Sequence, residues 1–221
     1  VKYDSAIPFK QAAMFEPSTV ALHGILDSGY RGGGYVAVLG CGTIGIFTAQ
    51  WARIFGSRKV VVFDIDNGRL ELAMSMGADA VVNTSEKDYP EKAMKLTDGK
   101  GYDFVFEAAG NTQTMHMAFE VAANKAKVCF IGTPQTDISF TRSEWERMNR
   151  KEFQLTGSWM SYSAPFPGRE WDLTAHYFST GQLKFDDAFI FRQYPMSQVR
   201  EAFNLFYNPK QVHGKILLVN D

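Results

Sequence analysis

The segment VAVLGCGTIG at residues 36–45 constrains the fold of this chain more than any other. A short apolar run leads into a turn whose glycines are Gly40, Gly42 and Gly45, and a helical pattern covers residues 43–55. The glycine spacing alone is weak evidence, but a buried strand before it and a helix after it form the first unit of a dinucleotide-binding sheet. The segment therefore predicts an α/β fold with a parallel sheet.

Strand and helix patterns continue to alternate after this segment. Apolar runs predict six strands, at residues 35–40, 59–65, 80–82, within 101–110, 126–132 and 153–157. The run at 59–65 is apolar on both faces, which is typical of a central strand with helices on both sides. We therefore predict a doubly wound Rossmann sheet of six parallel strands, in the order 3-2-1-4-5-6.

The two ends of the chain depart from this alternation. Residues 1–17 contain no complete strand or helix pattern, and Ser18 and Thr19 then supply hydroxyl groups to cap a helix that ends at Gly29. Beyond Gly157, a stretch rich in aromatic residues, serine and proline precedes helical patterns at 171–180 and 197–206 and a final strand, GKILLV. Because the chain starts with Val1, we expect it to be part of a longer one. Because the pattern changes after Gly157, we expect the tail to be a separate unit.

The three glycines have separate roles in a dinucleotide site. Gly40 permits the tight turn, Gly42 allows the pyrophosphate to approach the backbone, and Gly45 allows the helix to pack against the strand. The phosphates then lie at the N-terminus of the helix, where free N–H groups and the helix dipole attract negative charge.

Asp64 is placed to select the coenzyme. It lies 19 residues beyond Gly45, at the end of the second predicted strand. A carboxylate there binds the 2′-hydroxyl of the adenosine ribose and repels a 2′-phosphate, so we predict NAD rather than NADP. Two other interpretations remain open: Asp64 could only cap the strand end, and Arg69 could bind a 2′-phosphate instead of packing along the adenosine.

Charge and composition exclude several other functions. The net charge is −1 and the 23 Lys and Arg residues are spread along the chain, so there is no basic tract for nucleic acid or a membrane surface. No apolar run approaches the roughly 20 residues of a membrane helix. Cys41 and Cys129 are far apart, which fits a reducing, cytoplasmic setting, and we interpret Cys41 as a small loop residue rather than a redox thiol.

The sequence contains no recognisable motif for a catalytic group. Hydride transfer needs a group that stabilises the alkoxide, such as a zinc ion, a tyrosine with a lysine, or a histidine–acid pair. The two cysteines and four histidines do not have the spacing of metal ligands, and no tyrosine is followed four residues later by a lysine. The sequence therefore predicts a cofactor site without a metal site or a visible catalytic centre.

Five segments carry a family resemblance, in this order: EPSTVALHGI, VAVLGCGTIG, VVVFDIDNGRLELAMSMGADAVVN, FVFEAAGN and KVCFIGTP. They resemble the coenzyme-binding half of the zinc-dependent medium-chain dehydrogenase/reductase superfamily, in its sorbitol dehydrogenase-like branch. Residues 151–171, KEFQLTGSWMSYSAPFPGREW, resemble the galactitol-1-phosphate 5-dehydrogenases of that branch. The resemblance implies an NAD-dependent alcohol or polyol dehydrogenase that moves a hydride between the carbinol of a small polyol or polyol phosphate and the nicotinamide.

The resemblance also implies a longer enzyme. In this family a preceding catalytic domain supplies the ligands of a zinc ion, so zinc is expected only in the intact enzyme and this portion alone is expected to be inactive. The implied division is residues 1–17 as a remnant of the catalytic domain and junction, 18–159 as the NAD-binding domain, and 160–221 as an incomplete appendage that belongs to the catalytic domain. A homo-oligomer joined near residues 130–158 is also expected.

Site residues follow from the resemblance by position. Thr19 is expected to face the nicotinamide, and Glu16, before Pro17, to be a remnant of the active site near the zinc. The other implied cofactor-binding residues are Gly40, Gly42, Thr43, Ile44, Gly45, Asp64, Arg69, Ala108, Ala109, Gly110, Gly132, Thr133, Gly157, Ser158 and Trp159.

Two alternative functions remain open. A zinc-independent quinone or enoyl reductase of the same superfamily would use NADPH, and Asp64 argues against it. A stand-alone NAD-binding module would need a start codon just upstream of Val1, and the unpartnered tail argues against it.

Overall fold

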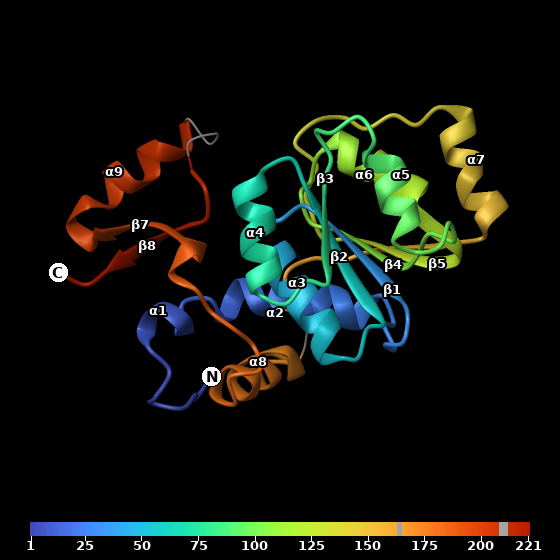
Figure 1. Ribbon diagram of the computed structural model, residues 1–221. Coiled ribbons are helices and arrows are strands. Elements are labelled where there is room, and N and C mark those ends of the chain that lie inside the picture. Colours follow the sequence, from blue (N-terminus) through green and yellow to red (C-terminus); the bar gives the residue numbers. More distant parts are fainter. Residues whose placement is uncertain (163–164, 208–211) are drawn as a thin grey trace.

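The computed structural model describes residues 1–162, 165–207 and 212–221. Its main sheet has six parallel strands in the order β3-β2-β1-β4-β5-β6, and β7 and β8 form a second sheet (Figure 1). The predicted Rossmann architecture and strand order are confirmed. The strands of the main sheet are β1 (Tyr35–Leu39), β2 (Lys59–Asp64), β3 (Ala80–Asn83), β4 (Tyr102–Glu107), β5 (Ala122–Phe130) and β6 (Gln154–Gly157).

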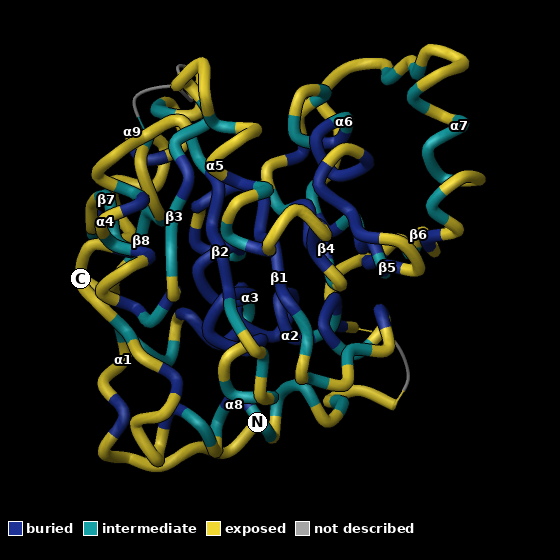
Figure 2. The backbone as a smooth tube through the Cα atoms, turned by 45° about the vertical axis from the view of Figure 1, so that its right-hand side comes forward, coloured by how far each residue is buried: buried dark blue, intermediate teal, exposed yellow. Residues whose placement is uncertain are grey.

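Helices cover both faces of the main sheet. They are α2 (Phe15–Asp27), α3 (Thr43–Ile54), α4 (Asn67–Ser75), α5 (Tyr89–Lys95), α6 (Thr112–Val121) and α7 (Arg142–Lys151), and α8 (Arg169–Ser179) packs against α2. All five residues of β1 are buried: Val36 and Val38 join the core under α2, α3 and α4, whereas Ala37 and Leu39 join the core under α5 and α6. Burial is deepest along the central strands, while α7 lies exposed at the edge of the sheet (Figure 2).

Several predicted boundaries were wrong. Helix α2 begins at Phe15, so Ser18 and Thr19 are buried inside the helix instead of capping it. Pro17 is tolerated because the first turn of a helix has no partner for its N–H. A short helix, α1 (Phe9–Ala12), lies in the segment expected to lack one. The cap of α4 is Asp66, whose side chain accepts a hydrogen bond from Arg69 N.

The C-terminal segment contributes a small second unit. Strand β7 (Ile190–Pro195), which the sequence analysis missed, pairs in parallel with β8 (Lys215–Val219), and α9 (Val199–Asn204) lies between them in the chain. A two-stranded sheet has little stability alone. Phe178 and Phe189, at the base of this segment, pack into the main core with Phe47, which attaches the unit to the sheet.

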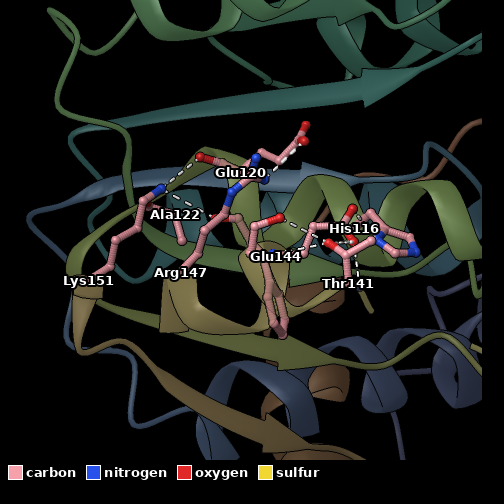
Figure 3. Close-up of polar contacts among 9 residues, drawn as sticks. His116, Glu120, Ala122, Thr141, Glu144, Arg147 and Lys151 are labelled. Atoms are coloured by element: carbon pink, nitrogen blue, oxygen red, sulfur yellow. Dashed lines mark hydrogen bonds and ion pairs between the residues drawn. The ribbon is translucent and has the colours of Figure 1, made fainter. Parts of the chain in front are cut away.

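None of the residues of α7 is buried, although Met148 packs partly against the core, and polar contacts help to position the helix (Figure 3). Lys151 Nζ donates hydrogen bonds to the carbonyl oxygens of Phe119, Glu120 and Ala122, at the C-terminal end of α6, at 3.3, 2.8 and 2.6 Å. Arg147 adds an ion pair to Glu120 at 3.0 Å. The ammonium thus satisfies carbonyl groups that a helix end leaves without partners. Burial, with a smaller contribution from Arg147, lowers the pKa of Lys151.

We expect Lys151→Met to destabilise the fold. Methionine keeps the stem but leaves three carbonyl groups without the ammonium, so the free energy of unfolding should fall by about 2 kcal/mol. Urea unfolding followed by circular dichroism measures this change. Arg150→Met is the matched control, because the exposed Arg150 pairs, among the described residues, with Glu146 one turn away, and its loss should cost about 0.5 kcal/mol or less. Equal losses in the two variants would contradict this role for Lys151.

Candidate functional site

The glycine loop joins β1 to α3, and the structural setting differs at each of its three glycine positions. Gly40 has a φ of +100°, which disfavours other residues. A Cβ on Gly45 would lie 1.9 Å from Gly40 O, so α3 packs directly against the turn. A Cβ on Gly42 would meet nothing within 4 Å. Gly42 is therefore not needed for packing, and its bare backbone faces open space where a ligand can approach.

Helix α3 presents its N-terminus to that space. Gly42 is its N-cap residue and, among the described residues, no side chain caps the helix. The first N–H groups of a helix lack partners within it and carry partial positive charge. Over the 12 residues of α3 this makes a ready site for a phosphate group.

Asp64 lies at the end of β2 and connects it to the glycine loop. Its Oδ2 accepts a hydrogen bond from Cys41 N at 2.7 Å, and its Oδ1 accepts from Ile65 N and Asp66 N at 2.8 and 3.0 Å. The side chain is 7% exposed. The carboxylate therefore holds the loop in place from one side while it remains next to the cavity described below.

Arg69 is the main cation beside Asp64. Its guanidinium lies 4.0 Å from Asp64 Oδ2, is 37% exposed and contacts His213 Nδ1 at 3.1 Å. Cys41 Sγ donates to Arg69 O at 2.9 Å. Burial, reinforced by the negative charge of Asp64, raises the pKa of Cys41 to about 12, so this thiol is not poised for redox chemistry.

Two cavities flank the glycine loop. The first, about 680 Å³, extends from the loop and Asp64 to α6 and is lined by Gly40, Cys41, Gly42, Phe63, Asp64, Ile65, Arg69, Thr84, Tyr89, Ala108, Ala109, Asn111, Gln113, Thr114, His116, Met117 and Glu120. The second, about 520 Å³, lies on the other side of the loop. It is lined by Cys41, Gly42, Thr43, Ile44, Ile46, Asp66, Gly68, Arg69, Leu72, Ala108, Ala188, Phe189, His213, Gly214 and Lys215.

The cavities bring together about half of the predicted site residues. Those that line at least one cavity are Gly40, Gly42, Thr43, Ile44, Asp64, Arg69, Ala108 and Ala109. They lie at or just after the C-terminal ends of β1, β2 and β4 and in the first turns of α3 and α4, at the edge where ligands bind in parallel sheets. Gly45 lies beneath the loop, where its role is packing.

The other predicted residues lie outside these two cavities. Gly110 packs against the backbone of Thr133, and Gly132 packs against Gly110, so the loops after β4 and β5 touch. Gly157 ends β6, Ser158 is buried and its N–H bonds to Phe130 O, and Trp159 is 69% exposed.

Thr19 and Glu16 also lie away from both cavities. Thr19 is fully buried, and its hydroxyl lies 2.7 Å from Ser161 Oγ and 2.8 Å from Glu16 O. Their expected roles at the nicotinamide and near the zinc stay predictions.

Sequence reasoning missed two groups at this site. His213 and Lys215 enter the second cavity from the C-terminal segment, 144 residues from Arg69 in the case of His213. No local pattern in the sequence marks them, because their position depends on where the C-terminal segment lies in the folded protein. Glu107, buried at the end of β4, was also missed, although its place at a strand end next to two small residues was a usable signal.

A metal centre is not visible in the part of the chain that the structure describes. No group of three or more His, Cys, Asp or Glu side chains lies close enough there to hold a metal ion. Cys41 and Cys129 are buried and free. The described residues therefore do not fit a zinc site, and no chemical step is assigned to zinc in this chain. Within the same residues, no helix is long and apolar enough to cross a membrane.

The fold and site define a Rossmann-type α/β protein with a glycine loop and an adjacent acidic strand end. The sequence model of the zinc-binding dehydrogenases matches residues 43–176. The chain belongs to the zinc-binding dehydrogenase family, which confirms the resemblance.

Individual relatives agree with this assignment. Galactitol 1-phosphate 5-dehydrogenase of Escherichia coli K12 is 32% identical over 214 residues, which cover 96% of this chain and 61% of that protein. The crystal structure of galactitol-1-phosphate dehydrogenase from Escherichia coli superposes with a TM-score of 0.89 at 30% identity, covering 98% of this chain and 62% of that one. A zinc-binding dehydrogenase from Sinorhizobium meliloti 1021 bound to NADP has a TM-score of 0.83 at 26% identity, covering 99% and 62%. This chain thus spans about three fifths of the relatives it matches.

Proposed function

We propose that this chain is the coenzyme-binding portion of an NAD-dependent, zinc-containing polyol dehydrogenase. The observation that carries the proposal is the position of Asp64, which lies beside the open face of the glycine loop and at the wall of the larger cavity. A carboxylate in this position binds a ribose 2′-hydroxyl and repels a 2′-phosphate, so NAD is preferred over NADP.

In this proposal the pyrophosphate lies over Gly42 at the start of α3, with Thr43 and Ile44 beside it. The adenosine occupies the first cavity, between Asp64 on one wall and Ala109 on the other. Bound NAD supplies the hydride acceptor. The residues of this chain hold the coenzyme, orient it and select it, and Arg69 packs along the adenosine.

We further propose a polyol phosphate, of the galactitol 1-phosphate type, as the substrate of the whole enzyme. Support comes from the galactitol-1-phosphate dehydrogenases among the relatives, which are named for this substrate and are longer than this chain. Zinc ligands would come from outside the described residues. In this proposal, residues 18–159 form the coenzyme domain, and 1–17 and 160–221 pack with the catalytic domain.

The same proposal includes an oligomeric state and a cellular location. Strand β6 is an edge strand with exposed residues, and such edges pair readily, so we propose a homo-oligomer joined along it. The two free cysteines support a reducing, cytoplasmic location.

Calorimetry with coenzyme fragments tests where the coenzyme lies. ADP-ribose contains the adenosine and pyrophosphate and should bind the purified chain, whereas nicotinamide mononucleotide, which has neither the adenosine nor the full pyrophosphate, should bind at least about tenfold more weakly. The reverse order of affinities would contradict the proposed placement of the coenzyme.

An activity assay tests the proposed need for a separate zinc domain. The chain with NAD and galactitol 1-phosphate should show no turnover. Turnover by metal-free protein would overturn this part of the proposal.

A further inference from the structure

Glu107, the last residue of β4, is a buried carboxylic acid that the proposed binding of NAD does not use. Its side chain is 0% exposed. It lies beneath two loops, residues 108–110 after β4 and 131–133 after β5. Both loops stand at the C-terminal edge of the sheet, where the glycine loop also lies.

One oxygen of Glu107 organises the first of these loops. Oε1 accepts hydrogen bonds from Ala109 N at 3.0 Å and Gly110 N at 2.9 Å. The hydroxyl of Thr114, in the first turn of α6, lies 2.6 Å from the same oxygen. The carboxyl group therefore fixes the path of the chain from β4 into α6.

The backbone of Glu107 organises the second loop. Its carbonyl oxygen accepts from Ile131 N at 2.8 Å and from Gly132 N at 2.9 Å. A Cβ on Gly132 would lie 2.6 Å from Glu107 Oε2 and 2.3 Å from Gly110 N. Only a residue without a side chain lets the two loops close over the carboxyl group.

The remaining oxygen, Oε2, is buried and has no hydrogen-bond partner among the described residues. Burying a polar atom without a hydrogen-bond partner costs free energy. Burial raises the pKa of Glu107, against the opposing hydrogen bonds from Thr114, Gly110 and Ala109. Buried polar groups without a partner are rare in folded proteins, and carboxyl groups with a perturbed pKa cluster at functional sites.

We propose that Glu107 is a positioning residue of the coenzyme site, which sets the spacing between the loop at 108–110 and the loop at 131–133. Ala108 and Ala109 line the cavities, and the N–H of Ala109 is held by this side chain. The proposal rests on the proposed function, because NAD is the ligand that the aligned loops receive. Glu107 acts through the loops and does not itself touch the coenzyme.

NADH titration of Glu107 variants tests this role. Glu107→Ala removes the acceptor for all three donors and should weaken NADH binding by about tenfold or more, because hydrogen bonds to an ionisable group are among the stronger ones. Glu107→Gln keeps an oxygen at the position of Oε1 and should restore the affinity to within about threefold of the wild type. This rescue by the conservative variant separates loop positioning from charge.

A matched pair of hydroxyl variants distinguishes a specific loss of NADH affinity from a general loss of stability. Thr114→Val removes one hydroxyl at the coenzyme edge of the sheet. Thr97→Val removes one at the opposite edge, where the fully buried Thr97 Oγ1 accepts from Gly101 N just before β4. Both should lower the melting temperature, but only Thr114→Val should weaken NADH binding, by about threefold or more.

The melting temperature as a function of pH gives an independent readout. Since the folded-state pKa of Glu107 lies above its unfolded value, the stability that this group contributes is complete below the unfolded pKa and is lost as pH rises. The Gln variant does not titrate. The melting temperature of wild type minus that of Glu107→Gln should therefore decrease as the pH rises above about 4.5, the ordinary pKa of a glutamic acid.

The outcomes distinguish the two proposals. Absence of NADH binding by the wild-type chain would refute the proposed function. If the wild type binds NADH and a folded Glu107→Ala variant binds it within about twofold, the positioning role alone is overturned. If Glu107→Ala does not fold, equal NADH affinities of Thr114→Val and Thr97→Val overturn it.

Discussion

Replacing Asp64 by asparagine should weaken NADH binding by about thirtyfold, or about 2 kcal/mol. Asparagine has the same shape but carries two N–H donors on one arm. Whichever way its amide is turned, that arm faces a backbone N–H group, of Cys41 on one side or of Ile65 and Asp66 on the other. The glycine loop loses its anchor, and the ribose loses a charged acceptor. Fluorescence titration with NADH measures the change in Kd.

The same substitution should reduce the preference for NADH over NADPH, since the negative charge that repels a 2′-phosphate is gone. Asp66→Asn is the matched control two residues away. Asp66 caps α4 through Arg69 N, and asparagine is an equally good N-cap residue, so this variant, which also removes a negative charge from the wall of the second cavity, should bind NADH at least as tightly as the wild type. Equal weakening in both variants would show that general charge, and not the contacts of Asp64, controls affinity.

Alanine at Gly45 and at Gly42 should separate stability from binding. At Gly45 the new Cβ would lie 1.9 Å from the carbonyl oxygen of Gly40. Because that oxygen belongs to the backbone and cannot rotate away, α3 must shift, and the free energy of unfolding should fall by about 3 kcal/mol. At Gly42 the Cβ has no neighbour within 4 Å and φ is −76°, so the fold should lose less than about 1 kcal/mol.

The binding results should be reversed. Gly42→Ala places a methyl group where the pyrophosphate approaches, and NADH affinity should fall by at least about tenfold in a protein of nearly wild-type stability. Urea unfolding and NADH titration of the two variants provide the comparison. If Gly42→Ala binds NADH normally, the phosphate does not lie over this loop.

The fold followed from the sequence wherever the pattern is local. The run at 59–65 and the glycine turn at 40–45 each mark a buried strand or a strand–helix junction, and the sheet order follows from their alternation. Strand β7 was missed because its residues alternate irregularly between half-buried and exposed positions, and its partner β8 lies 20 residues further along. The start of α2 was misplaced because Pro17 was taken to precede the helix when it lies in its first turn.

The same difference applies to the candidate site. Gly42 and Asp64 could be predicted as candidates because the roles proposed for them depend on spacing along the chain. His213 was not found, since it reaches Arg69 only through the tertiary path of the C-terminal segment. Glu107 was not found because its function, as we propose it, lies in the backbone groups it holds, and a single sequence does not reveal which loops meet over a side chain.

Parallel fluorescence titrations of the purified chain with NADH and NADPH measure whether Asp64 selects NAD. We expect saturable NADH binding with NADPH at least about tenfold weaker, which corresponds to about 1.4 kcal/mol from the repulsion of the 2′-phosphate by Asp64. Equal or tighter binding of NADPH would contradict it and would assign Arg69, with His213 beside it, to a 2′-phosphate.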